Sequence, residues 1–242
     1  MIRIGHRGAA GWEPQNTRLS FEKAITLGCD FIETDVHLCK TGELILCHDA
    51  RIDATSNGTG LIAEMSLDEL QRYDFGKGQT VMHLEQLLDL ATDRIGLNIE
   101  LKGPGSGTAT AGVLKKELVD PSGWWHNHLM VTSFNHRELR AFQNALPSVP
   151  AGALIKAVLL DTAAYLDQLD VSFLVTSVEF IDKDLVDEVH ATGRDVYVYT
   201  VDDPADIARM QHLGADGLIG NFPDRFPLPE PHLRRSPYQG VH

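Results

Sequence analysis

The stretch Phe31-Ile-Glu-Thr-Asp-Val-His-Leu-Cys-Lys-Thr-Gly-Glu-Leu-Ile-Leu-Cys-His-Asp49 decides how the chain is organised. Its first half alternates like a β-strand, which places Glu33 and Asp35 on one face. Two carboxylates on one face of a strand supply half of a site for a hard divalent cation. Thr41-Gly42 then predicts a tight turn and a returning strand. A turn centred there pairs Asp35 with His48, so one hairpin delivers two carboxylates and a histidine to the same place.

Outward from this hairpin, apolar periodicity and turn residues predict alternating strands and helices. The predicted strands are 2–6, 31–36, 95–101, 128–133, 151–155, 173–178, 195–200 and 216–220, and the predicted helices are 17–27, 84–91, 109–118, 137–145, 162–169, 182–192 and 204–213. Such alternation indicates an α/β fold with a parallel sheet, and eight such strands are the number that closes a TIM (β/α)8 barrel. The hairpin return at 43–48 is antiparallel and is not one of the eight.

The sequence therefore predicts a single TIM-barrel domain over residues 1–226. The hairpin return and the polar, glycine-rich segment behind it form a small insertion after the second strand, at approximately 37–80, with a short helix at 67–73. Residues 227–242 are rich in proline and are expected to form an extended or disordered C-terminal tail.

The composition of the chain argues against some kinds of binding partner and location. A net charge of −13 argues against nucleic acid or an anionic membrane surface, although local cations still allow a small anionic substrate. Met1-Ile-Arg-Ile does not begin a signal peptide, and no run of about 18 apolar residues predicts a membrane span. The cysteines Cys29, Cys39 and Cys47 are expected to be reduced and buried, with the last two on opposite faces of the hairpin. We therefore expect a cytoplasmic protein, whose oligomeric state stays open.

Charged side chains gather where the first three barrel strands and the hairpin return end. They are His6, Arg7, Glu33, Asp35, His48, Glu100 and Lys102. A single histidine or glutamate at a strand end is more often a scaffold residue. Here four segments send charges to the C-terminal mouth of one barrel, where the active sites of such barrels lie. Burying so many charges without a ligand costs several kcal/mol each, so their convergence predicts a functional site.

The charges divide into two kinds of binding group. Glu33, Asp35 and Glu100 supply the oxygen ligands that Mg²⁺ or Ca²⁺ prefers. Arg7 and Lys102 supply positive charge suited to a phosphoryl oxygen, and arginine binds such oxygens in a bidentate way. We therefore expect a divalent metal ion and a phosphorylated substrate.

The two histidines complete a set of groups for phosphoryl transfer on a diester. His6 and His48 titrate near neutrality, as a general base and a general acid must. The cation would neutralise developing charge while one histidine activates the nucleophile and the other protonates the leaving alkoxide. Phe134 and Tyr199 end strands at the same mouth and are candidates for walls of the substrate pocket. His37 shares a face with Asp35 and is a weaker candidate.

Six short motifs of this chain resemble those of the glycerophosphodiester phosphodiesterases. They are His6-Arg7-Gly8, Pro14-Gln15-Asn16-Thr17, Glu33-Thr-Asp35-Val36, His48-Asp49, Glu100-Leu-Lys102 and Gly214-Ala-Asp216-Gly217. The resemblance implies a TIM-type barrel, a divalent cation, and hydrolysis of a small glycerophosphodiester to an alcohol and sn-glycerol 3-phosphate. It gives the acid–base role to the two histidines, metal ligation to the three carboxylates, and a phosphate-side role to Arg7 and Lys102.

Three positions depart from the pattern of that family. Gln15 stands where glutamate is usual, which removes a charge near Arg7. Tyr199 stands where tryptophan is usual, which keeps an apolar wall and adds a hydroxyl. Asn221 stands where aspartate is common.

Other functions stay open beside the leading one. A phosphodiesterase of the same fold acting on a lysophospholipid or another phosphodiester would need an apolar groove at the mouth, and the segment 51–78 has few large apolar residues. A non-catalytic binding relative is a second alternative, with Gln15 as its first sign, but such a protein has little reason to keep both histidines and all three carboxylates. A barrel aldolase using Lys102 would have no use for the metal site.

Overall fold

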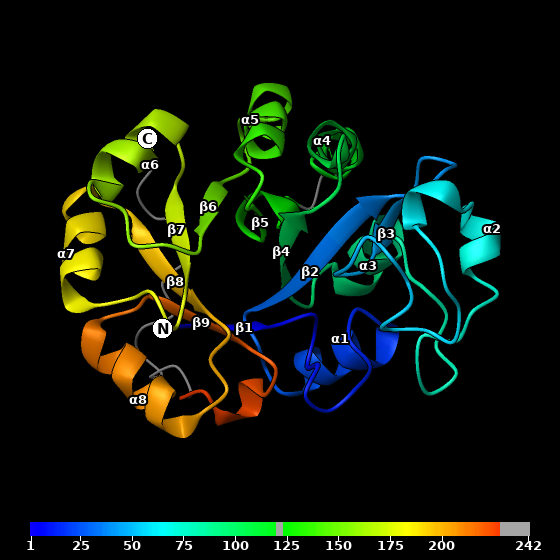
Figure 1. Ribbon diagram of the computed structural model, residues 1–242, viewed down its shortest axis with the longest axis horizontal. Coiled ribbons are helices and arrows are strands. Elements are labelled where there is room, and N and C mark those ends of the chain that lie inside the picture. The colour runs from blue at the N-terminus through cyan, green and yellow to red at the C-terminus, as the bar shows by residue number, and fades with distance from the viewer. Residues whose placement is uncertain (120–122, 228–242) are drawn as a thin grey trace.

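The computed structural model describes residues 1–119 and 123–227, and within them nine strands form one sheet in the order β1-β9-β8-β7-β6-β5-β4-β2-β3. An additional pairing of β1 with β2 closes eight parallel strands into a barrel, and β3 is an extra strand bonded to β2. Figure 1 shows the helices around the outside of these strands. The predicted TIM barrel with an extra hairpin strand is confirmed.

The elements follow the predicted alternation closely. The strands are β1 (Ile2–Gly5), β2 (Phe31–Leu38), β3 (Leu44–Leu46), β4 (Gly96–Leu101), β5 (Leu129–Ser133), β6 (Ala151–Ile155), β7 (Phe173–Ser177), β8 (Asp195–Tyr199) and β9 (Gly217–Gly220). The helices are α1 (Arg18–Thr26), α2 (Leu67–Leu70), α3 (Leu84–Ala91), α4 (Ser106–Glu117), α5 (His136–Ala145), α6 (Thr162–Leu169), α7 (Lys183–Ala191) and α8 (Pro204–Leu213), with short 3₁₀ turns at Ile62–Glu64, Trp124–Asn127 and Pro223–Arg225. In the part of the chain that the structure describes, no helix is long and apolar enough to cross a membrane.

The hairpin register differs from the prediction by one residue. Val36 pairs with Leu46 and Leu38 with Leu44, so Asp35 lies opposite Cys47 and not opposite His48. The reason is a three-residue loop over 40–42, closed by the hydrogen bond from Cys39 N to Glu43 O at 3.0 Å. Gly42 has a φ of +99°, and a loop of this length usually needs a glycine in that left-handed region.

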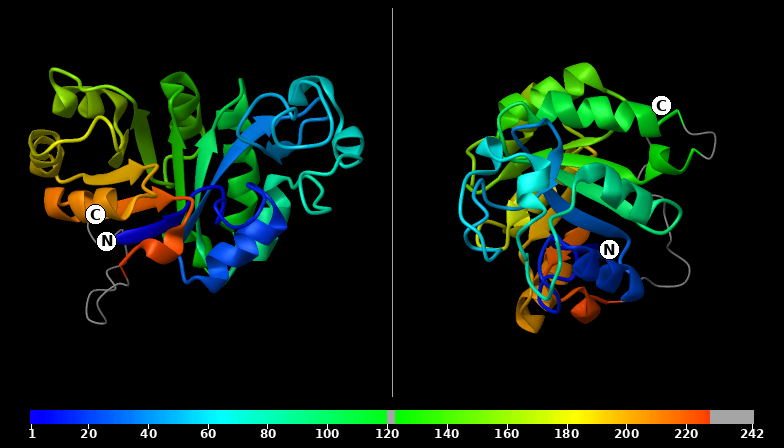
Figure 2. Two further views of the ribbon diagram at one scale, coloured as in Figure 1. Left: turned by 60° about the horizontal axis from the view of Figure 1, so that its bottom comes forward. Right: turned by 90° about the vertical axis from the view of Figure 1, so that its right-hand side faces the viewer.

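The corrected register also overturns the predicted placement of two cysteines. Cys39 and Cys47 lie on the same face of the hairpin and belong to one apolar cluster with Ile45 and residues of the insertion. That cluster holds the insertion against β3, and it includes Ile52, Ile62, Leu70, Phe75 and Val81. All three cysteines are unpaired. In the left view of Figure 2 the insertion lies to one side of the barrel. The prediction that buried thiols act as small apolar residues is confirmed for this pair.

The interior of the barrel changes character along its axis. Near the N-terminal ends of the strands it is apolar, with Phe31, Met130 and Phe173 packed in one cluster. Phe31 fits because Gly96 lies opposite, where an added Cβ would stand 2.4 Å from a Phe31 ring carbon. Two and four residues further along β2 the same inward face carries Glu33 and Asp35, as strand alternation requires. The apolar floor therefore ends in a charged mouth.

The predicted domain limits remain a prediction. The ordered elements run to the 3₁₀ turn at Pro223–Arg225, and all of the predicted tail except Pro227 lies outside the described residues.

Candidate active site

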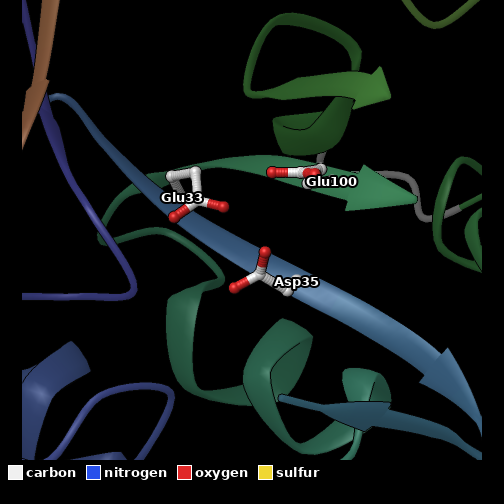
Figure 3. Close-up of side chains that lie close together, drawn as sticks. All are labelled: Glu33, Asp35 and Glu100. Carbon is white, nitrogen blue, oxygen red and sulfur yellow. The ribbon is translucent and has the colours of Figure 1, made fainter. Parts of the chain in front are cut away.

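Three buried carboxylates lie together at the mouth of the barrel. Glu33 and Asp35 project from β2 and Glu100 from the neighbouring β4, and Figure 3 shows them turned toward a common space. One oxygen from each lies within 4.8 Å of the others. The residues are 4%, 1% and 8% exposed, respectively. Glu33 Oε1 and Asp35 Oδ1 are buried and accept no hydrogen bond from the described residues. An oxygen-only donor set with unsatisfied buried atoms fits a hard divalent cation.

The pKa values of the three carboxylates also support a site for a divalent cation. Burial raises the pKa of Glu33 well above its usual value, and the neighbouring carboxylates raise it further. Burial and then Asp35 raise the pKa of Glu100 to about 7. Burial would also raise the pKa of Asp35, but Arg7 and Lys102 hold it below its usual value. All three carboxylates can be ionised together only beside further positive charge, which a bound divalent cation would supply.

The two positively charged side chains that the sequence predicts at the site, Arg7 and Lys102, flank the three carboxylates. Lys102 Nζ lies 2.9 Å from Glu100 Oε1 and 3.7 Å from Asp35 Oδ1. Arg7 Nε lies 3.5 Å from Asp35 Oδ2, and the Arg7 backbone N–H donates to Glu33 Oε2 at 2.8 Å. Arg7 has a φ of +52°, a left-handed conformation that costs an L-residue about 1–2 kcal/mol. This conformation lets one residue serve two carboxylates, through its backbone and through its side chain.

The glutamine that departs from the family pattern still contacts this arginine. Arg7 Nη1 donates to Gln15 Oε1 at 2.5 Å. The substitution therefore keeps a hydrogen bond and loses a charge.

His6 lies between the carboxylates and the loop after β9. Its Nδ1 is 2.8 Å from Asn221 Oδ1, and its Nε2 is 4.0 Å from Glu33 Oε2. Burial lowers the pKa of His6 to about 4, and the nearby charge of Arg7 acts in the same direction. The ring is therefore neutral at physiological pH, which leaves one nitrogen free to accept a proton.

His48 lines the same cavity as His6 and is held by its neighbour Asp49. Its Nδ1 is 2.7 Å from Asp49 Oδ1, and the side chain is 35% exposed. His37 donates from Nε2 to the backbone carbonyl of His48 at 3.1 Å, because a carbonyl only accepts. His37 thus fixes the backbone that carries His48.

Two adjoining cavities meet at His6 and Arg7. A cavity of about 110 Å³ is lined in part by His6, His48, Glu33, Glu100, Phe134 and Tyr199. The Phe134 and Tyr199 rings meet edge to face at 5.9 Å and form one wall. A wider, open cavity of about 570 Å³ continues past His6 and Arg7 toward Gln15 and Phe222. A substrate with two parts joined by a phosphate can therefore place one part in each cavity.

Two asparagines to which the sequence alone assigned no role at the site lie there in the structure. Asn16 is 4% exposed, donates from Nδ2 to Asp35 Oδ2 at 3.0 Å and accepts from Thr34 Oγ1 at 2.8 Å. Asn221 contacts His6. Both lie on loops that follow β1 and β9, and the only sequence signals were their places in or near the family motifs.

The chain is similar to known proteins over nearly its whole length. The model of the Glycerophosphoryl diester phosphodiesterase family matches residues 6–225. A glycerophosphodiester phosphodiesterase of Bacillus altitudinis is 30% identical over 238 residues, covering 92% of this chain and 95% of that protein. One of Caldanaerobacter subterraneus is 30% identical over 231 residues, covering 91% and 94%.

Solved structures are similar over the same span. A phosphodiesterase of Oleispira antarctica in complex with the product sn-glycerol-3-phosphate has 27% identity and a TM-score of 0.85, covering 93% of this chain and 94% of that one. A glycerophosphodiester phosphodiesterase of Agrobacterium tumefaciens has 25% identity and a TM-score of 0.80, covering 93% and 99%.

Proposed function

The chain belongs to the glycerophosphoryl diester phosphodiesterase family and is thus a phosphoric diester hydrolase, and from that premise we propose that it hydrolyses glycerophosphodiesters to an alcohol and sn-glycerol 3-phosphate in a metal-dependent reaction. The observation that carries the proposal is the convergence of three buried carboxylates, two cations and two histidines on one cavity. The sn-glycerol 3-phosphate held by the Oleispira relative supports the product class.

The metal ligands would be Glu33, Asp35 and Glu100, holding Mg²⁺ or Ca²⁺. When bound, the cation supplies positive charge that stabilises the charge developing on the phosphoryl oxygens. Asn16 orients Asp35 by its hydrogen bond. Arg7 and Lys102 border the cluster and would bind the phosphate from the protein side.

His6 and His48 would transfer the protons. His6 is largely buried and neutral, and its Nε2 faces the carboxylate cluster, so it takes the proton from the hydroxyl of the attacking water as the new P–O bond forms. His48 is more exposed, and its protonated imidazole gives its proton to the alkoxide as the P–O bond to the alcohol breaks. Each turnover thus moves one proton onto His6 and one off His48, and exchange with water restores both.

A lysophospholipid substrate is a second candidate, favoured by apolar side chains at the mouth. Phe134 is 44% exposed, Val158 is 61% exposed, and Leu160 is fully exposed. Phe134 follows β5, and Val158 and Leu160 lie in the loop after β6, where strand C-terminal ends open into the mouth. An acyl chain would cover these side chains.

One assay separates these possibilities. The purified protein is incubated with glycerophosphocholine or with lysophosphatidylcholine, in Mg²⁺, Ca²⁺ or EDTA, with His6→Ala alongside. We expect choline and sn-glycerol 3-phosphate from glycerophosphocholine, lost in EDTA and in the variant. Faster release of choline from lysophosphatidylcholine, lowered by Leu160→Ser, would favour the second candidate. A protein that turns over neither substrate in either metal contradicts both.

A further inference from the structure

Asp202, Asn221 and His6 form a chain of hydrogen bonds that ends in the candidate active site. Asp202 Oδ1 accepts from the backbone N–H of Asn221 at 2.7 Å, and Asp202 Oδ2 accepts from Asn221 Nδ2 at 2.6 Å. Asn221 Oδ1 in turn lies 2.8 Å from His6 Nδ1. The three residues follow β8, β9 and β1, which are consecutive strands in the barrel.

The direction of every bond in this chain is fixed by chemistry. An ionised carboxylate only accepts hydrogen bonds, so Asp202 requires the amide nitrogen of Asn221 to face it. The amide oxygen must then face His6, and an amide oxygen also only accepts. His6 Nδ1 therefore carries the hydrogen, and in the neutral ring Nε2 keeps its lone pair.

The surrounding backbone holds the chain of bonds in place. Val201 N donates to Ile219 O at 2.9 Å, and His6 N donates to Gly220 O at 2.9 Å. An added Cβ on Gly220 would stand 2.3 Å from Val201 O and 3.1 Å from Asp202 Oδ1, so only glycine permits this approach. Arg225 Nη1 also donates to Asp202 O at 2.8 Å. The loops after β8 and β9 thus present the aspartate to the asparagine at a fixed distance.

We propose that Asp202 is a positioning residue that acts through Asn221 to keep His6 in its Nδ1–H tautomer, with Nε2 free to accept the proton of the attacking hydroxyl. The catalytic consequence of this inference, that His6 acts as the general base, rests on the proposed function. The tautomer itself is a property of the protein without substrate. The positioning role of Asp202 also accounts for the departure at Asn221: an amide backed by a carboxylate orients the histidine in place of a carboxylate acting directly.

The decisive variant is Asp202→Asn. Its amide oxygen can still accept from the backbone N–H of residue 221, but its amide nitrogen then faces the amide nitrogen of Asn221. Rotation of the Asn221 amide by 180° relieves this contact and turns its N–H toward His6 Nδ1. We expect the ring to change to the Nε2–H tautomer, which lacks a lone pair where the base acts. Loss of a general base lowers kcat by about 100-fold or more.

The tautomer is read directly by long-range ¹H–¹⁵N NMR of histidine-labelled protein at pH 7.5, with the His6 signals assigned by their loss in His6→Asn. We expect a protonated Nδ1 in the native protein and a protonated Nε2 in Asp202→Asn. The double variant Asp202→Asn/Asn221→Asp should restore both the native tautomer and most of kcat, because the new carboxylate accepts from Nδ1 directly. Asp53→Asn, which removes a carboxylate that accepts Gly60 N–H in the insertion, should change neither.

These experiments test the role of Asp202 separately from the proposed phosphodiesterase function. A native His6 protonated at Nε2, or an unchanged tautomer in Asp202→Asn, overturns the inference. Low activity in Asp202→Asn that the double variant fails to restore, with the native tautomer retained, also overturns it. Absence of turnover in a native protein that shows the expected tautomer refutes the proposed function and leaves the orienting role of Asp202 supported by the NMR result.

Discussion

Replacing Asn16 with aspartate tests how much the hydrogen bond from Asn16 to Asp35 contributes to the stability of the buried carboxylate cluster. Asn16 is nearly the same shape as aspartate, and Thr34 would still donate to its first oxygen. The second oxygen would replace Nδ2, which lies 3.0 Å from Asp35 Oδ2, so a donor–acceptor contact becomes a contact between two charges of like sign. Two unit charges at that separation repel by about 5 kcal/mol at an effective dielectric constant of about 20.

We therefore expect Asn16→Asp to lower the free energy of unfolding in EDTA by about 5 kcal/mol at pH 8. For a chain of this length that corresponds to a fall in Tm of at least about 10 °C. The deficit should shrink as the pH falls, because the carboxyl pair in the folded state has one raised pKa and gains a shared proton, whereas in the unfolded chain the carboxyls stay ionised to lower pH.

The assay is urea and thermal unfolding of the metal-free proteins at several pH values. The matched control is Asn57→Asp, the same change at an exposed position of the insertion, where the side chain accepts from Asp74 N–H. A carboxylate accepts that bond equally well, so no loss is expected. An Asn16→Asp protein within about 1 kcal/mol of the native one at pH 8, or one whose deficit grows at low pH, would refute the account of the cluster.

Three further predictions concern residues around the site and the core. Arg3→Met should lower the free energy of unfolding by about 3 kcal/mol in urea titrations, because the buried guanidinium donates to three backbone carbonyls, whereas Arg18→Met on the exposed face of α1 should not. Cys29 should resist iodoacetamide at pH 8 in the native protein, because burial raises its thiol pKa to about 12; peptide mapping that finds it alkylated before unfolding would contradict this. Gln15→Glu should change kcat/KM by less than about tenfold, since the bond to Arg7 already exists; a larger gain would mean that the missing charge limits the enzyme.

The order of elements was predictable because each barrel strand is short, apolar and bounded by turn residues. The limits of α3, β6, α6 and α8 match the predicted ranges. Alternation along β2 and β4 also predicted that the carboxylates of each strand face inward. The hairpin register was not predictable to the residue, since Thr41-Gly42 fits both a two-residue and a three-residue loop, and both loops accept a left-handed glycine. Only the observed pairing of Cys39 with Glu43 and of Leu38 with Leu44 distinguishes them.

The residues that position the charged side chains of the site were harder to predict from the sequence than the charged residues themselves. The predicted site residues stand at strand ends, where barrel topology brings them together whatever the loops do. Asn16 and Asn221 instead depend on loop conformations that carry them back toward Asp35 and His6, and no periodic pattern encodes such contacts. His37 was considered for its face on β2, but its contact with the His48 backbone depends on the register that the sequence left open.

Calorimetric titration of Mg²⁺ and Ca²⁺ into the metal-free protein tests the central claim most directly. We predict one cation bound for each chain, with binding lost in Asp35→Asn and kept in Asp53→Asn, and release of sn-glycerol 3-phosphate lost in the same variant. Binding of equal strength in Asp35→Asn, or full turnover by a native protein that binds no cation, would contradict the assignment of this buried carboxylate cluster as the metal site of a phosphodiesterase.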